Sequence, residues 1–182
     1  MAEPQSRERI LDAAERRARA GGYNGFSFRD LAEDVGVKSS SVHYHFPTKA
    51  HLAERLAERY TARARERLGD AESLSPDQAI ECVTSLFRDA LQVDDQMCLC
   101  GLFGAERDAL PPPVRAAVAA FFEMILDYLR TAFGPDWTGP SPAAVLASLE
   151  GALILARALG DARSFEEATG KFGVHGETRR AQ

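Results

Sequence analysis

The stretch from Ser27 to Lys49 constrains this chain most, because its pattern predicts two short helices around a tight turn. Ser27 stands where a capping side chain is expected, and Asp30 follows at the position from which it can bond back to the cap. An apolar stripe at helical spacing comes next. Gly36 then ends the first helix, because glycine adopts a positive φ easily. Pro47 makes continuation of the second helix unfavourable.

The second predicted helix, residues 39–46, has an unusual outer surface. Its outward positions hold short hydroxyls and flat rings that carry hydrogen-bonding groups. Such side chains suit the major groove of DNA, where donors and acceptors must reach base edges and phosphates. The pattern therefore predicts a helix-turn-helix whose second helix reads DNA. A helical hairpin that only packs is the alternative interpretation.

The same stretch resembles the DNA-binding core of the TetR/AcrR family of bacterial repressors. The matching segments are Phe28-Arg29-Asp30-Leu31-Ala32, Gly36-Val37 and Val42-His43-Tyr44-His45-Phe46-Pro47-Thr48-Lys49. The resemblance implies a ligand-responsive transcriptional repressor. Its homodimer would place two reading helices in successive major grooves of a pseudo-palindromic double-stranded DNA operator. It also implies that a small-molecule effector, bound in the rest of the chain, weakens DNA binding.

On this resemblance the DNA-binding side chains lie in and around the second helix. Those expected to face bases are Ser39, Ser40, Ser41 and His43, and those expected to hold phosphates are Ser27, Tyr44, His45, Thr48 and Lys49. Arg29 and Lys38 are further candidates. The chain departs from the family at His43, where a Tyr is usual, and at Lys38, where a small hydroxyl is common. The operator sequence is therefore not transferable.

Apolar residues recur at helical spacing along the rest of the chain, without a strand pattern or an internal repeat. The sequence predicts an all-α fold of about nine helices. Besides the two above, they cover residues 5–21, 48–68, 75–91, 97–110, 114–133, 142–159 and 164–172. Ser75, Ser141 and Ser164 are expected to cap three of them.

A polar break at residues 69–73 marks the expected domain boundary. Before it lies the helix-turn-helix DNA-binding domain, residues 1–49, followed by a connecting helix over 48–68. After it lies the domain expected to bind the effector and to form the dimer, residues 70–182. The connecting helix can act as a lever, because rotation at its far end moves the reading helix.

Charge is distributed unevenly between the two parts. Residues 1–68 hold 13 Lys and Arg against 10 Asp and Glu, whereas the remaining residues hold 9 against 17. A mildly basic head on an acidic body suits a protein that docks one end on phosphate. The overall net charge of −5 therefore does not argue against a nucleic-acid partner.

The helix expected over 142–159 is rich in Ala and Leu on several sides. A helix that is apolar nearly all round must be buried on more than one face. In the resembled family the last two helices pair with those of a second copy. The corresponding prediction is a homodimer through residues of about 142–172, completing a four-helix bundle. Burial within a single chain is the alternative.

Bulky apolar residues in the body predict a pocket for a small, largely apolar effector. The residues expected to line it are Tyr60, Phe87, Leu91, Met97, Phe103, Phe121, Met124, Tyr128 and Trp137. Arg88, Arg107 and Arg130 are available to an anionic group on that effector. Core packing alone is the alternative role for each of these side chains.

Three cysteines, Cys82, Cys98 and Cys100, are odd in number and imply no disulfide scaffold. Cys98 or Cys100, near an expected helix start, is a candidate sensor thiol. An alternative function is therefore a repressor that senses oxidants or electrophiles, although Asp94 and Asp95 oppose a lowered thiol pKa. The other interpretation is that these cysteines are small buried hydrophobic residues.

The sequence offers no support for an enzyme, since it contains no Gly-rich phosphate loop, Gly-x-Ser-x-Gly or His-Glu-x-x-His. His43, His45 and His51 lack the spacing of a zinc site, so neither a metal nor a cofactor is expected. No apolar run approaches the roughly 18 residues of a membrane span, and the N-terminus lacks a signal-peptide core. We therefore expect a cytoplasmic protein without a membrane partner. A DNA-independent helical adaptor dimer is the alternative from another class.

Overall fold

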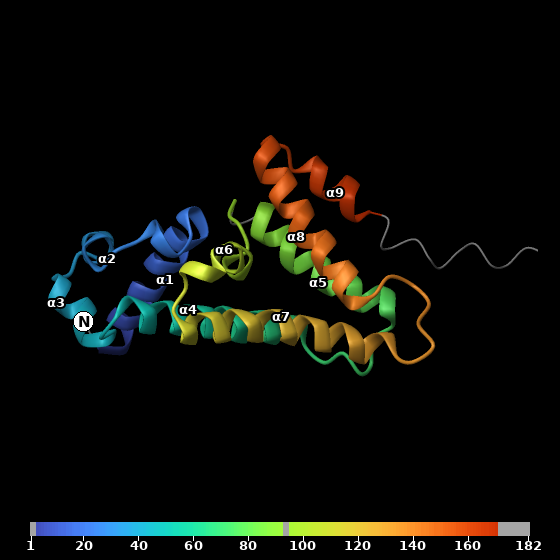
Figure 1. Ribbon diagram of the computed structural model, residues 1–182, viewed down its shortest axis with the longest axis horizontal. Helices are drawn as coiled ribbons and strands as arrows, with labels where there is room; N and C mark the ends of the chain where they lie inside the picture. The colour runs from blue at the N-terminus through green and yellow to red at the C-terminus, as the bar shows by residue number, and fades with distance from the viewer. Residues whose placement is uncertain (1–2, 93–94, 171–182) are drawn as a thin grey trace, which may run out of the picture. The chain divides into compact units, whose positions relative to one another are not determined.

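The computed structural model describes residues 3–92 and 95–170. Within them the chain forms nine α-helices, two short 3-10 helices and no strand (Figure 1). The expected all-α class is therefore confirmed. The elements are α1 (Glu3–Gly21), η1 (Tyr23–Gly25), α2 (Phe28–Val35), α3 (Ser39–His45), α4 (Lys49–Leu68), α5 (Pro76–Gln92), α6 (Leu99–Ala105), η2 (Arg107–Ala109), α7 (Pro112–Phe133), α8 (Pro142–Leu159) and α9 (Arg163–Thr169).

The described residues fall into two compact units. The first holds residues 3–62 and 99–121, and the second holds residues 63–92, 95–98 and 122–170. Residues 99–121, which contain α6, η2 and the first part of α7, thus belong with the helix-turn-helix rather than with their neighbours in the sequence. The expected boundary at residues 69–73 stays a prediction.

The core of the first unit lies among α1, α2, α3 and the first part of α4, which gather at the N-terminal end of the ribbon (Figure 1). Ile10, Leu31, Val42 and Leu52, one from each helix, have no exposed surface. Burying a side chain of this kind fully contributes roughly 1.5–3 kcal/mol. The two helices of the helix-turn-helix are therefore held by a core to which other helices contribute.

Several helix starts follow the expected capping pattern. The Ser75 hydroxyl accepts the Gln78 N–H at 3.3 Å, and the Gln78 amide oxygen accepts the Ser75 N–H at 2.9 Å. At the start of α8, the Ser141 hydroxyl accepts the Ala144 N–H at 3.2 Å. These contacts satisfy backbone donors that have no partner within the helix.

The start of α9 differs from the expectation. Ala162 occupies the cap position of α9 and makes no side-chain cap hydrogen bond, so the prediction that Ser164 caps this helix is wrong. The Asp161 carboxylate instead accepts the Arg163 N–H at 3.0 Å. An aspartate two residues before the first residue of α9 thus accepts a backbone N–H at the helix start, the role that the sequence pattern assigned to Ser164.

The helix expected over residues 97–110 is broken into two short pieces. α6 ends at Ala105, and η2 covers Arg107–Ala109. Gly101 and Gly104 lie within α6, and each glycine in a helix interior costs roughly 1 kcal/mol relative to alanine. Because the two glycines destabilise the helix, α6 is shorter than the helix that the sequence pattern predicts.

In the second unit α8 packs against both α5 and α9 (Figure 1). Val83 of α5, Leu149 and Leu153 of α8 and Phe165 of α9 have no exposed surface and form the core among these helices. At the edge of this core the Arg88 guanidinium donates to the Glu166 carboxylate at 2.8 Å and 3.2 Å, linking α5 to α9.

The outer face of α8 is exposed in the single chain. Ile154, Leu155 and Leu159 keep 55%, 46% and 64% of their surface exposed. Over its 18 residues α8 has a mean hydropathy of 1.5 and is 33% buried, so by length and composition it can cross a membrane. The expectation that no apolar run reaches this length is therefore wrong. One such helix is weak evidence for a membrane, because it carries Glu150 and Arg157 and because core helices pass the same test.

Candidate DNA-binding surface

The first helix of the helix-turn-helix begins with a reciprocal cap. The Ser27 hydroxyl accepts the Asp30 N–H at 3.2 Å, and the Asp30 carboxylate accepts the Ser27 N–H at 2.9 Å. The Ser27 hydroxyl also donates to this carboxylate at 2.7 Å, which lowers the Asp30 pKa. The capping box predicted from the sequence is thus confirmed. It fixes where α2 begins.

The turn between α2 and α3 is closed by backbone hydrogen bonds. Gly36 has φ 71° and ψ 40°, the left-handed conformation expected for it. Its N–H donates to the Glu33 carbonyl at 3.2 Å, and the Val37 N–H donates to the Ala32 carbonyl at 2.9 Å. α3 then starts after Lys38, which occupies the cap position without a side-chain hydrogen bond. The serine run therefore lies inside the first turn of α3 rather than capping it.

α3 has one buried face and one exposed face. Val42 has no exposed surface, whereas Ser39, Ser40 and His43 are exposed and Ser41 is half-buried. The Tyr44 ring keeps 72% of its surface exposed. A large, exposed aromatic side chain beside three hydroxyls is the combination of flat ring and short donors that suits base edges and phosphates.

The two histidines of α3 are braced by other rings. The His43 ring lies 4.6 Å from the Phe28 ring of α2, edge to face, and the His45 ring lies 5.3 Å from the Tyr44 ring. Both contacts fall in the range of favourable aromatic pairs. These contacts favour particular orientations of the two histidine rings.

α4 begins beside α3. The Thr48 hydroxyl accepts the His51 N–H at 3.1 Å and so caps α4. The Lys49 side chain turns inward, with its ammonium 4.8 Å from the centre of the Tyr23 ring and 4.7 Å from that of the Phe26 ring. The predicted phosphate contact of Lys49 stays a prediction, but the ammonium already has partners within the chain.

Some of the charged side chains near the helix-turn-helix form ion pairs within the first unit. The Arg17 guanidinium donates to both Asp34 carboxylate oxygens, at 2.5 Å and 2.8 Å, which lowers the Asp34 pKa. The Arg59 guanidinium is held by three carboxylates, those of Glu8, Asp12 and Glu15. Arg29 and Lys38, which belong to the predicted DNA-binding set, are exposed.

Sequence reasoning missed one contact of this unit. The Glu106 carboxylate accepts the Tyr23 N–H at 2.7 Å, although the two residues are 83 positions apart. The Tyr23 ring also lies 6.1 Å from the Phe103 ring of α6. No short-range sequence pattern indicates a contact between residues that lie so far apart in the chain.

The residues predicted to line an effector pocket do not all belong to one unit. Tyr60, Phe103 and Phe121 lie in the first unit, and Phe87, Leu91, Met97, Met124, Tyr128 and Trp137 lie in the second. Phe87, Phe103 and Phe121 are at most 2% exposed and fill core positions. The Trp137 indole donates to the Pro140 carbonyl of its own loop at 2.8 Å. The effector pocket therefore remains a prediction.

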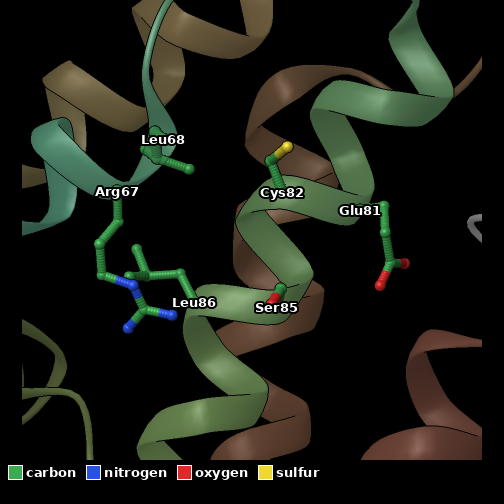
Figure 2. A pocket seen from close by; sticks show the side chains of 6 residues that line it. All are labelled: Arg67, Leu68, Glu81, Cys82, Ser85 and Leu86. Atoms are coloured by element: carbon green, nitrogen blue, oxygen red, sulfur yellow. The ribbon is translucent and has the colours of Figure 1, made fainter.

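A cavity of about 310 Å³ lies in the second unit (Figure 2). Arg67 and Leu68 line it from the end of α4, and Glu81, Cys82, Ser85 and Leu86 line it from α5. Figure 2 shows the Glu81 carboxylate on the far side of α5 from Arg67. None of the residues predicted for the effector pocket lines this cavity.

The three cysteines differ in exposure. Cys98 and Cys100, the candidate sensor thiols, are 2% and 0% exposed, whereas Cys82 is half-buried and lines the cavity. All three are free thiols. Among the described residues no group of three or more His, Cys, Asp or Glu side chains has the arrangement of a metal site.

The helix-turn-helix matches a known family model. Residues 10–56 match the model described as bacterial regulatory proteins, tetR family. A curated relative is the HTH-type transcriptional repressor KstR of Rhodococcus jostii (strain RHA1), 30% identical over 93 residues. The match covers 51% of this chain and 44% of that protein, so the chain spans less than half the length of this curated relative.

Solved structures resemble the chain over nearly its whole length. A TetR-family transcriptional regulator from Agrobacterium tumefaciens has a TM-score of 0.83 and 27% identity, covering 93% of this chain and 96% of that one. A TetR transcriptional regulator from Legionella pneumophila has a TM-score of 0.76 and 29% identity, covering 91% and 94%. The likeness thus extends from the DNA-binding motif through the helices that follow it.

Proposed function

Since this chain belongs to the tetR family of bacterial regulatory proteins, we propose that it is a homodimeric repressor that a small-molecule effector releases from its operator. The observation that carries the proposal is the exposed face of α3. Tyr44 is 72% exposed on a helix whose opposite face, at Val42, is completely buried. A reading helix needs this combination, because one face must hold it to the head while the other enters the major groove.

The proposal assigns roles to individual side chains, and their exposure on the helix-turn-helix supports these roles. Ser39, Ser40 and His43, exposed on α3, contact bases. The Tyr44 hydroxyl and the capped start of α4 at Thr48 hold phosphates, because backbone N–H groups at a helix start attract anions. Two such heads, one from each chain of a dimer, read the two halves of a pseudo-palindrome.

The dimer forms through α8 and α9. The exposed Ile154, Leu155 and Leu159 form an apolar surface on α8, and an exposed apolar surface of this kind marks a site of association. A second copy covers this surface in the proposed dimer, because α8 of each chain presents the same face. Burial of α8 in this interface also explains why the proposed cytoplasmic DNA-binding protein contains such an apolar helix.

Repression rather than activation is supported by the name of the curated relative, which is a transcriptional repressor. The effector is a small molecule bound mainly by the helices after α4, where the apolar side chains predicted to line a pocket lie, apart from Tyr60 of α4 itself. Its binding favours a conformation with lower affinity for the operator, which couples the two ligands thermodynamically.

The test is a fluorescence anisotropy titration of the full chain with duplex DNA from upstream of its own gene, over a series of salt concentrations. We expect specific binding that weakens steeply with salt, because phosphate contacts release counterions. Salt-insensitive or absent binding across several such duplexes would contradict a repressor and favour a DNA-independent helical adaptor.

A further inference from the structure

Tyr23 lies at the meeting point of two distant parts of the first unit. Its backbone N–H donates to the Glu106 carboxylate at 2.7 Å. Its ring lies 6.5 Å from the Phe26 ring and 6.1 Å from the Phe103 ring, both edge to face. η1, which starts at Tyr23, is thus attached to the segment that runs from α6 into η2.

The backbone before Tyr23 is shaped to admit the carboxylate. Gly22 has φ +68°, and a Cβ atom built there would lie 2.2 Å from a Glu106 carboxylate oxygen. Real Cβ atoms do not approach other atoms so closely. A side chain at position 22 would therefore require the Glu106 carboxylate to shift from its place at the Tyr23 N–H.

The ammonium of Lys49 rests on the same rings. It lies 4.8 Å from the centre of the Tyr23 ring and 4.7 Å from that of the Phe26 ring, within the range of cation–π contacts. Burial lowers the Lys49 pKa, and the negative charges of Glu106 and Asp30 counteract that effect. The two rings thus hold the ammonium within the first unit, and the nearby carboxylates help to keep it charged there.

Lys49 also stands in the first turn of α4, next to the capping Thr48 and four residues after the end of α3. A lysine in this position reaches phosphate only when its ammonium leaves the rings. The intramolecular site and the DNA backbone therefore compete for the same cation.

We propose that Glu106 is a positioning residue for DNA binding: by holding the Tyr23 backbone, it keeps the Tyr23–Phe26 ring pair beneath the Lys49 ammonium and withholds that cation from phosphate. The proposal rests on the proposed function, since it requires that the head bind DNA. Glu106 itself touches no nucleic acid. Its hydrogen bond to the Tyr23 N–H determines whether the Lys49 ammonium of each chain is available to contact a DNA phosphate.

Two substitutions at Glu106 distinguish the effect of its side-chain length from the effect of its charge. Glu106→Asp keeps the charge but shortens the side chain by one methylene, so the bond to the Tyr23 N–H is lost. Glu106→Gln removes the charge but keeps an oxygen that accepts this N–H. Asp108→Asn is the matched control, because it removes one charge from the same segment at a completely exposed side chain.

The probe is duplex DNA of random sequence, which reports the phosphate contacts without base recognition. We expect Glu106→Asp to steepen the dependence of log K on log salt by about 0.9 for each chain, the value for one added phosphate contact. Glu106→Gln and Asp108→Asn should share the wild-type slope. Adding Lys49→Met to Glu106→Asp should remove the gain in slope.

Amide hydrogen exchange at Tyr23 and thermal melting accompany the titration. We expect faster exchange of the Tyr23 amide in Glu106→Asp, with protection retained in Glu106→Gln. A Glu106→Asp slope equal to that of the control, or a gain that persists with Lys49→Met, would overturn the proposal. Equal salt slopes for Glu106→Asp and Glu106→Gln would also contradict the proposal. Wild-type protein that does not bind duplex DNA in a salt-dependent way would instead contradict the proposed function.

Discussion

The Tyr128 hydroxyl donates a hydrogen bond to the carbonyl of Leu68 at 3.1 Å and so joins α7 to the last residue of α4. The last carbonyls of a helix have no partner within it, so this bond satisfies an acceptor that burial would otherwise leave unpaired. Tyr128 is 8% exposed, and burial together with the nearby Cys82 thiol raises its pKa.

Tyr128→Phe is therefore expected to lower the free energy of unfolding by about 1–3 kcal/mol, the cost of an unpaired buried acceptor. Urea denaturation followed by circular dichroism measures this change. Phe122→Leu, an apolar change on the same helix at a half-buried position, controls for general repacking. A Tyr128→Phe protein as stable as wild type would show that water replaces the bond.

Tyr44 provides the sharpest test of the reading face. Because its ring is 72% exposed, Tyr44→Ala should leave the melting temperature nearly unchanged and weaken operator binding by at least about tenfold, or 1.4 kcal/mol. Tyr44→Phe should cause part of this loss, because it removes only the hydroxyl that is expected to bind phosphate. A large fall in melting temperature for Tyr44→Ala would mean that the ring supports the core instead.

Glu150 makes stability depend on pH. Both of its carboxylate oxygens are buried, and the Cys98 thiol is a hydrogen-bonding neighbour of this carboxylate. Burial raises its pKa from 4.5 to about 7, and the Cys98 thiol beside it opposes this rise only in part. Between these two values the folded chain holds a proton that the unfolded chain releases. Stability from this group is thus complete below pH 4.5 and is lost as pH rises through about 7.

Glu150→Gln removes this ionisation while keeping the shape of the side chain. At pH 8 the variant should be more stable than wild type by up to about 3 kcal/mol, and the difference should shrink as the pH falls towards 5. Urea denaturation at several pH values measures it, with the exposed Glu167→Gln as control. A difference that is constant with pH would show that Glu150 is already ionised in the folded chain.

The thiols should react in the order of their exposure. Cys82 lines a cavity, whereas Cys98 and Cys100 are almost completely buried. A chromogenic disulfide reagent should therefore modify one thiol per chain in the native state and the other two only after denaturation. Cys82→Ser should abolish the native reaction. Rapid modification that persists in this variant would revive Cys98 or Cys100 as the sensor.

The features that sequence predicted well depend on residues close together in the chain. The Ser27–Asp30 cap and the turn at Gly36 are set by side chains and backbone within a few positions, so their physical cause is visible in the sequence. The bond between Glu106 and Tyr23 spans 83 positions and follows from packing alone. The inward turn of Lys49 depends on the same packing. Ser164 was predicted as a cap because it fits the pattern, but Asp161 lies earlier and bonds the Arg163 N–H instead.

The apolar surface of α8 leads to the last prediction. Leu155 is 46% exposed between Ile154 and Leu159, which are exposed to a still greater degree. If a second copy covers this surface, Leu155→Glu places a carboxylate from each chain in the interface, where burying an unpaired charge is costly. We expect sedimentation velocity to show a dimer for wild type and a monomer for Leu155→Glu at micromolar concentration.

Thr131→Glu, on the exposed surface of α7, introduces the same side chain elsewhere and should leave the dimer intact. The monomeric variant should also bind operator DNA at least about a hundredfold more weakly, because each head then binds its half-site without the other. Its binding to random duplex DNA should fall much less. A Leu155→Glu protein that remains a dimer would place the interface away from this face of α8, and the exposed leucines would then need another partner.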